Sequence, residues 1–146
     1  MRETDHIHLL KLSVGTESVD GLEAWIDQYG RRRKDRERHV HVTRMWPRQE
    51  AKVLAGGSMY WVIRGQIQCR QKIIGLEEAT GADGIRRCAI VMEPALIRTT
   101  TAPRRPFQGW RYLDPADAPP DLPSARGTES ALPPQLEQAL SDIGLR

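Results

Sequence analysis

Apolar and polar residues alternate along several stretches of the chain, and this alternation is typical of β-strands. HIHLLKLSVG (6–15) predicts a first strand, HVHVTRMW (39–46) a second, and IRRCAIVMEP (85–94) a late strand that its proline ends. The block SMYWVIRGQIQCRQKIIGLEE (58–78) has the strongest β pattern, because it is apolar on both faces before its first glycine and alternates after it. We therefore expect four or five strands.

Apolar residues at helical spacing follow the first strand. Those within 22–29 recur at i, i+3, i+4 and i+7, and Thr16 or Ser18 can cap the helix that they predict. Pro47 can open a second, short helix. Near the C-terminus, the stretch 135–146 has the spacing of a short amphipathic helix.

The order of these elements predicts an α+β fold with a mixed, barrel-like β-sheet and two or three helices packed on it. Residues 1–113 form the expected domain. Six prolines fall within residues 114–134, which predicts a linker or a segment wrapped on the surface. The C-terminal helix over 135–146 completes the expected organisation.

Length and composition are those of a soluble globular protein. The chain has 146 residues, of which 39% are hydrophobic and 28% charged. No stretch has the pattern of a signal peptide or a membrane span, so we expect a cytoplasmic protein without a membrane partner. Cys69 and Cys88 lie in apolar strand-like runs and are expected to be buried, reduced thiols.

The net charge of +3 is unevenly distributed. Residues 1–113 contain 20 basic and 13 acidic residues, whereas residues 114–146 contain two basic and six acidic ones. A basic body favours an anionic partner such as RNA or another single-stranded nucleic acid.

Arginines and aromatic residues cluster in the later strands and are the candidate ligand-binding residues. The arginine side chain is a planar, bidentate reader of phosphates and base edges, and aromatic rings stack on unpaired bases. The candidates are Arg70, Arg86, Arg87, Arg104, Arg105, Arg111, Trp61, Trp110 and Tyr112. The same aromatics also suit a core, and in RRPFQGWRYL (104–113) alternation predicts a closing strand with Trp110 and Tyr112 on one face.

Two H-x-H pairs lie on predicted strands, where each pair points to one face. His8, His39 and His41 are therefore candidate metal ligands, although no carboxylate or cysteine stands at ligand spacing beside them. The alternative is that these histidines are partly exposed at a sheet edge. No P-loop, G-x-G-x-x-G or nucleophile-elbow pattern is present, so no catalytic residue is predicted.

Four blocks of the chain carry a family resemblance. HVTRMWP, GGSMYWVIRG, GIRRCAIVMEP and RRPFQGWRYL, the last followed by PADAPPD, resemble the uncharacterised alphaproteobacterial family "domain of unknown function 1489" over about residues 6–122. The resemblance implies a small cytoplasmic bacterial protein with no assigned cofactor. From about residue 39 to 113, the order of elements is also similar to that of PUA-like barrels of the ASCH and EVE types, which often bind RNA or modified bases. GQIQCRQK (65–72) lacks the ASCH pattern G-x-K-x-x-x-R, so no ligand residue is transferred.

These observations leave three functions open. The first is a noncatalytic binding module for RNA, DNA or a modified nucleobase, built on a PUA-like barrel. The alternative is a protein-interaction or assembly protein that uses the Pro-rich segment (114–134) and the C-terminal helix (135–146), with its partner bound through residues 123–146. The third is a metal-dependent enzyme that acts through the H-x-H pairs.

Overall fold

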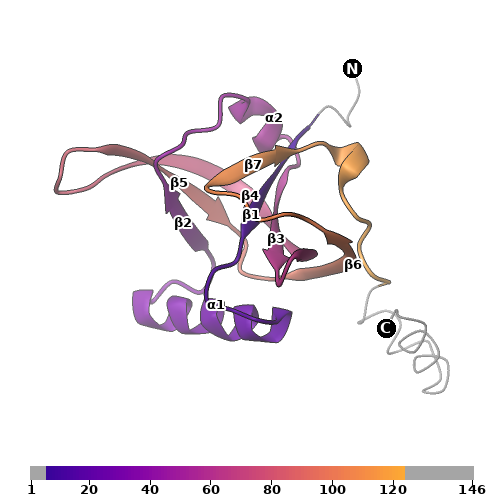
Figure 1. Cartoon of the computed structure of the whole chain (residues 1–146). Helices are drawn as coiled ribbons and strands as arrows, with labels where there is room; N and C mark the ends of the chain where they lie inside the picture. Colours follow the sequence, from indigo (N-terminus) through magenta and orange to yellow (C-terminus); the bar gives the residue numbers. More distant parts are fainter. Residues whose placement is uncertain (1–5, 124–146) are drawn as a thin grey trace.

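A seven-stranded mixed sheet with two helices forms the protein, so the predicted α+β class is confirmed (Figure 1). The computed structural model describes residues 6–123. The strands are β1 (His8–Leu12), β2 (His39–Thr43), β3 (Ser58–Ile63), β4 (Gln66–Thr80), β5 (Arg86–Met92), β6 (Ile97–Pro103) and β7 (Trp110–Leu113). The helices are α1 (Val19–Arg33) and α2 (Glu50–Leu54), and the 3-10 turn η1 (Pro115–Asp117) follows β7.

The long strand β4 lies at the centre of the sheet, whose path runs β2-β5-β4-β3-β1-β7. Along one edge β4 pairs with β3, and along the other it pairs first with β6 and then with β5. Strand β1 is parallel to β3 and antiparallel to β7. Arg64 and Gly65 join β3 to β4 with φ angles of 54° and 81°, which is the pair of left-handed conformations that a type I′ hairpin turn requires.

The sheet does not close, so the predicted PUA-like barrel is wrong. Within residues 6–123, β7 pairs only with β1, and the free edge of β6 is covered instead by the chain that follows η1. Thr99 bridges Asp121 there, and Leu122 N–H donates to Arg98 O at 2.9 Å. Because β7 has only four residues and follows the edge of β1, it does not reach β6.

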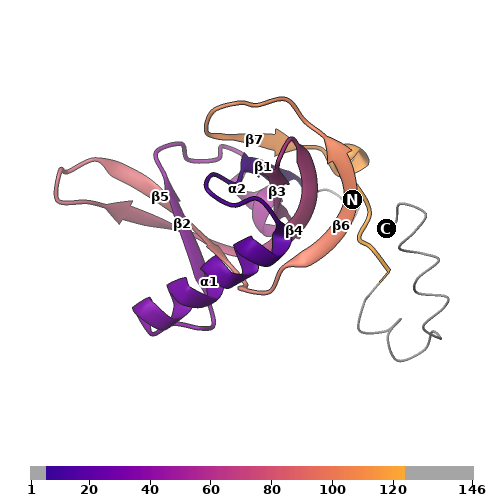
Figure 2. The ribbon, with the colours of Figure 1, turned by 60° about the horizontal axis from the view of Figure 1, so that its bottom comes forward.

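Helix α1 packs on the sheet beside β2 (Figure 2). Ser18 caps the helix, as predicted, and its Oγ accepts a hydrogen bond from Gly21 N–H at 2.9 Å. Trp25 belongs to the apolar residues at helical spacing within 22–29, but 44% of it is exposed. The reason is that it lies beside the buried stripe of the helix, which consists of Val19, Leu22, Ile26 and Gly30.

Strand β2 turns its histidines rather than its valines toward the core. His39 is only 2% exposed, whereas Val42 is 46% exposed. His39 is paired with Met92 of β5, and paired residues share a face, which here is the one under α1. His8 on β1 is buried as well, so the expectation of partly exposed histidines is wrong for His8 and His39.

Both faces of the sheet carry packed side chains. One buried cluster lies under α1, and a second, on the opposite face of β1, β3 and β4, includes Leu10 and Tyr60. Cys69 and Cys88 are buried free thiols, as predicted, and burial raises the pKa of Cys69 to about 12 and that of Cys88 to about 11. Both thiols are therefore protonated and poor nucleophiles. Among residues 6–123, no helix has the length and apolar character needed to cross a lipid bilayer.

Candidate functional site

A cavity of about 340 Å³ opens between α1, the loop after β1, and strands β2 and β3. Its walls include the rings of Trp25 and Trp61, the imidazoles of His39 and His41, and the side chain of Lys11. The two histidines share a face because they are two residues apart on one strand. Lys11 joins them because it is the register partner of Trp61 in the parallel pair of β1 and β3.

A series of hydrogen bonds runs behind the cavity from Trp61 through Gln71 to His39. Trp61 Nε1–H donates to Gln71 Oε1 at 2.9 Å. Gln71 Nε2 donates to Glu93 O at 2.9 Å and lies 3.2 Å from His39 Nδ1. Gln71 is fully buried, so these contacts are made away from water and are stronger than they would be at the surface.

The same series fixes the tautomer of His39. An indole nitrogen only donates, so the oxygen of the Gln71 amide must face Trp61 and its NH2 group must face His39. His39 Nδ1 therefore accepts, and the neutral ring carries its proton on Nε2. That nitrogen is buried without a hydrogen-bond partner among the described residues. A buried donor left unsatisfied costs about 1–3 kcal/mol, so a ligand acceptor at this point would be stabilising.

Burial keeps both cavity histidines neutral near pH 7. It lowers the pKa of His39, and it lowers that of His41 from 6.5 to about 4 with help from the nearby charge of Lys11. The pKa of Lys11 is lowered by burial too. The cavity thus combines apolar rings, uncharged imidazoles and one amine.

A second hollow lies on the outer surface of α1 and shares Trp25 with the cavity. Trp25 and Tyr29 have ring centroids 5.6 Å apart, and the Arg33 guanidinium lies over the Tyr29 ring, 4.7 Å from its centroid. Arg32 completes the lining of the hollow. The two sites together form an aromatic path with basic side chains at one end, which we call the α1 path.

Most of the arginines predicted to bind a ligand are engaged within the protein. Arg70 donates to both carboxylate oxygens of Asp121 at 2.8 Å and to Ser58 Oγ at 2.8 Å. This contact holds the chain after η1 against the sheet. Arg87 Nη2 forms a salt bridge with Asp83 Oδ2 at 2.7 Å. The Arg86 guanidinium carbon lies over the Trp46 ring, 4.4 Å from its centroid.

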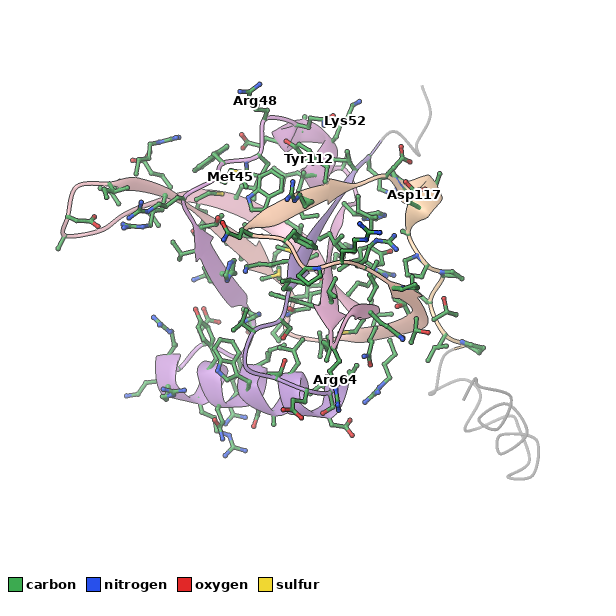
Figure 3. All side chains as sticks on the ribbon, in the orientation of Figure 1. Met45, Arg48, Lys52, Arg64, Tyr112 and Asp117 are labelled. Atoms are coloured by element: carbon green, nitrogen blue, oxygen red, sulfur yellow. The ribbon has the colours of Figure 1, made fainter. Side chains whose placement is uncertain are left out.

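The last four residues of RRPFQGWRYL form β7, which is an edge strand beside β1 and does not close the sheet. Trp110 and Tyr112 lie on one face of it, as predicted, with ring centroids 4.9 Å apart. Trp110 Nε1–H donates to Met45 O at 2.8 Å, and Tyr112 Oη accepts from Gln49 N–H at 3.0 Å. Figure 3 labels Tyr112 and Met45 on the side of the molecule away from α1. On the other face, Arg111 lies over the ring of Phe107. In the chain before β7, Arg104 donates to Pro103 O and Asp117 O, and Arg105 is exposed. We call this region the β7 cluster.

Of the nine predicted ligand-binding residues, Trp61 alone lines the cavity. Lys11, Trp25 and Gln71 belong to the site although the sequence did not indicate them. Gln71 did carry a signal, because it stands at an inward position of β4 between the buried Cys69 and Ile73. A buried amide at such a position needs partners, and these partners form the back of the cavity.

The three candidate metal ligands are not brought together. His39 and His41 line the cavity, whereas His8 Nδ1 accepts a hydrogen bond from Ser58 N–H at 3.0 Å and the His8 ring packs against Tyr60. Within residues 6–123, no group of three or more His, Cys, Asp or Glu side chains is placed to hold a metal ion. The predicted C-terminal helix and most of the predicted interaction segment lie outside the described residues.

Comparison with known proteins adds a family. The model of the family described as "Protein of unknown function (DUF1489)" matches residues 9–146. No curated protein and no solved structure matches the chain. The similarity to PUA-like proteins that the order of elements implied is not supported.

Proposed function

The chain belongs to this family of proteins of unknown function, and we propose that it is a noncatalytic module that binds single-stranded nucleic acid by taking up an unpaired or modified base. The observation that carries the proposal is the cavity beside α1, where two indole rings and two neutral imidazoles surround about 340 Å³. Ligand pockets range from roughly 300 to 1,000 Å³, so this cavity is at the small end and suits a single base.

The aromatic rings supply the attraction. A base that stacks on an aromatic side chain gains about 1–3 kcal/mol, largely independent of sequence, because every base has a π face. Trp25 stands at the mouth of the cavity with 44% of its surface exposed, so its ring is accessible to a base that enters. Trp61 is held in place deeper in the cavity by its bond to Gln71.

Basic side chains beside the cavity suit the phosphates of a strand. Arg32 and Arg33 lie about two helical turns beyond Trp25 on α1, and Lys11 lies in the cavity wall. With its base in the cavity, a strand that continues over Tyr29 brings its next phosphates toward these arginines. The excess of basic residues in the body of the protein favours the same encounter.

The test is a fluorescence anisotropy titration of the full chain with labelled, unstructured single-stranded RNA and DNA at a series of salt concentrations. We expect binding that weakens steeply as salt rises, with the logarithm of the affinity falling by about 0.7 per phosphate contact for each tenfold rise in salt. Absence of binding at low salt would overturn the proposal.

A matched pair of variants locates the site. The double substitution Arg32→Gln and Arg33→Gln should make the plot of the logarithm of the affinity against the logarithm of the salt concentration less steep. The slope should fall by about 1.4, the value for two lost phosphate contacts. The substitutions Arg104→Gln and Arg105→Gln remove the same charge from the β7 cluster and should leave the slope nearly unchanged. The reverse result would place the site at the β7 cluster.

A further inference from the structure

His39 Nε2 is the only buried side-chain nitrogen or oxygen atom in residues 6–123 that has no hydrogen-bond partner. The two nitrogens of an imidazole point in nearly opposite directions. Because Nδ1 faces Gln71 within the sheet, Nε2 faces α1, where the rings of Trp25 and Tyr29 lie 5.4 and 4.9 Å from the imidazole, centroid to centroid. Contacts between N–H groups and aromatic rings are weaker than a bond to oxygen, so this donor retains much of its capacity to bind an acceptor.

We propose that His39 makes the cavity selective for bases that present a carbonyl oxygen, such as uracil, thymine and guanine, over bases that present an amino group at the same position, such as cytosine and adenine. This inference rests on the proposed function. The Nε2–H group donates to the carbonyl oxygen of a favoured base. An amino group would instead bring a second donor against it and leave both unsatisfied.

The hydrogen-bond series behind the cavity protects this selectivity. A proton on His39 Nδ1 would face the NH2 group of Gln71, and Gln71 cannot turn its amide over without losing its bond to Trp61. Burial disfavours the charged ring as well and lowers the pKa of His39. Lys11 adds a second donor to the cavity wall, so the fixed polar groups favour a ligand rich in acceptors.

Trp25 controls access to this donor. Nε2 is sealed from solvent, and the Trp25 ring, which packs against the imidazole, is the more exposed of its two aromatic neighbours. A change of the Trp25 rotamer uncovers the nitrogen and presents the indole face to the incoming base. The base then stacks on Trp25 while its edge meets His39.

The experiment compares oligouridine with oligocytidine of equal length, which differ in the carbonyl or amino group at position 4 and in the donor or acceptor character of N3. Fluorescence anisotropy with the full chain should give about tenfold tighter binding of oligouridine. This is the factor expected when one ligand forms a hydrogen bond that the other ligand cannot form. Equal affinities would overturn the inference while the proposed function stands. Binding of neither oligonucleotide at low salt would instead remove the proposed function itself.

Two variants assign the preference to one atom. His39→Asn keeps a polar group near the position of Nδ1 for Gln71 but has no atom at the position of Nε2. The ratio of the affinities for oligouridine and oligocytidine should therefore fall to about one. Its binding should remain salt-dependent, because Arg32 and Arg33 are unchanged. His39→Gln extends an amide toward the position of Nε2 and should restore part of the preference. A preference that His39→Asn leaves intact would overturn the role of His39.

Nuclear magnetic resonance of the unmodified protein tests the same claim even where a variant fails to fold. The ¹⁵N and ¹³C shifts of the His39 ring should identify the tautomer with its proton on Nε2, and the Nε2–H signal should move when oligouridine is added. A proton on Nδ1, or an Nε2–H signal unaffected by saturating oligouridine, would overturn the inference.

Discussion

The α1 path and the β7 cluster contain similar residue types, but they differ in how many of their polar and aromatic groups have partners within the protein. In the β7 cluster, Trp110 and Tyr112 bond to backbone groups of the chain between β2 and α2, and Arg111 covers Phe107. In the α1 path, a cavity remains, Trp25 is half-exposed and His39 Nε2 has no partner among the described residues. Aromatic and basic residues therefore mark a site only where the fold leaves a space and an unused polar group beside them.

The largest expected difference between the two regions is in stability. Trp110→Ala should lower the free energy of unfolding by about 3–5 kcal/mol, because it empties a buried position and removes the bond to Met45. Trp25→Ala should cost only about 1 kcal/mol, since the ring is half-exposed. Urea denaturation followed by circular dichroism measures both. A larger loss for Trp25→Ala would mean that α1 depends on this ring for its packing.

The next effect is a dependence of stability on pH, to which one histidine in the cavity and one on the strand beside β7 contribute. His41 lies in the cavity, and His8 pairs with Leu113 of β7. Burial lowers the pKa of each from 6.5 to about 4, so the unfolded chain binds more protons between these values. The contribution of these histidines to the free energy of unfolding is therefore fully present above about pH 6.5. It is lost as the pH drops toward 4, by at most about 1.4 kcal/mol per pH unit for each histidine.

Urea denaturation at a series of pH values from 7 down to 5 measures this slope. His8→Gln and His41→Gln should each make it shallower, because each removes one group whose pKa differs between the folded and unfolded states. An unchanged slope in both variants would show that these imidazoles titrate normally in the folded protein.

The local elements were predictable from the sequence, whereas the closure of the sheet was not. Alternation in 58–78 and the helical spacing after Ser18 depend on neighbouring residues, and both patterns appear in the structure. Whether the sheet becomes a barrel depends on what covers the free edge of β6. That edge is met by Asp121, which is held in place by Arg70 from β4. Such a contact between distant residues has no local pattern.

The candidate site was predictable only in part for the same reason. Residue types indicated Trp61 and the histidines of β2, but the cavity also needs the pairing of β3 with β4, which brings Gln71 behind Trp61. This register shifts between Trp61 and Val62, and no spacing rule reveals such a shift. Arg104 was predicted to bind a ligand because one of its partners, the backbone oxygen of Asp117, lies beyond β7 and is not apparent from the local sequence.

The most direct test of the α1 path uses the indole N–H signals of the four tryptophans, one of which lies in the β7 cluster. A titration of the ¹⁵N-labelled full chain with single-stranded RNA reports on both regions at once. We expect the signals of Trp25 and Trp61 to shift and that of Trp110 to stay in place, because only the first two line the cavity. A shift of Trp110 with Trp25 and Trp61 unaffected would contradict the proposed site and place nucleic-acid binding at the β7 cluster.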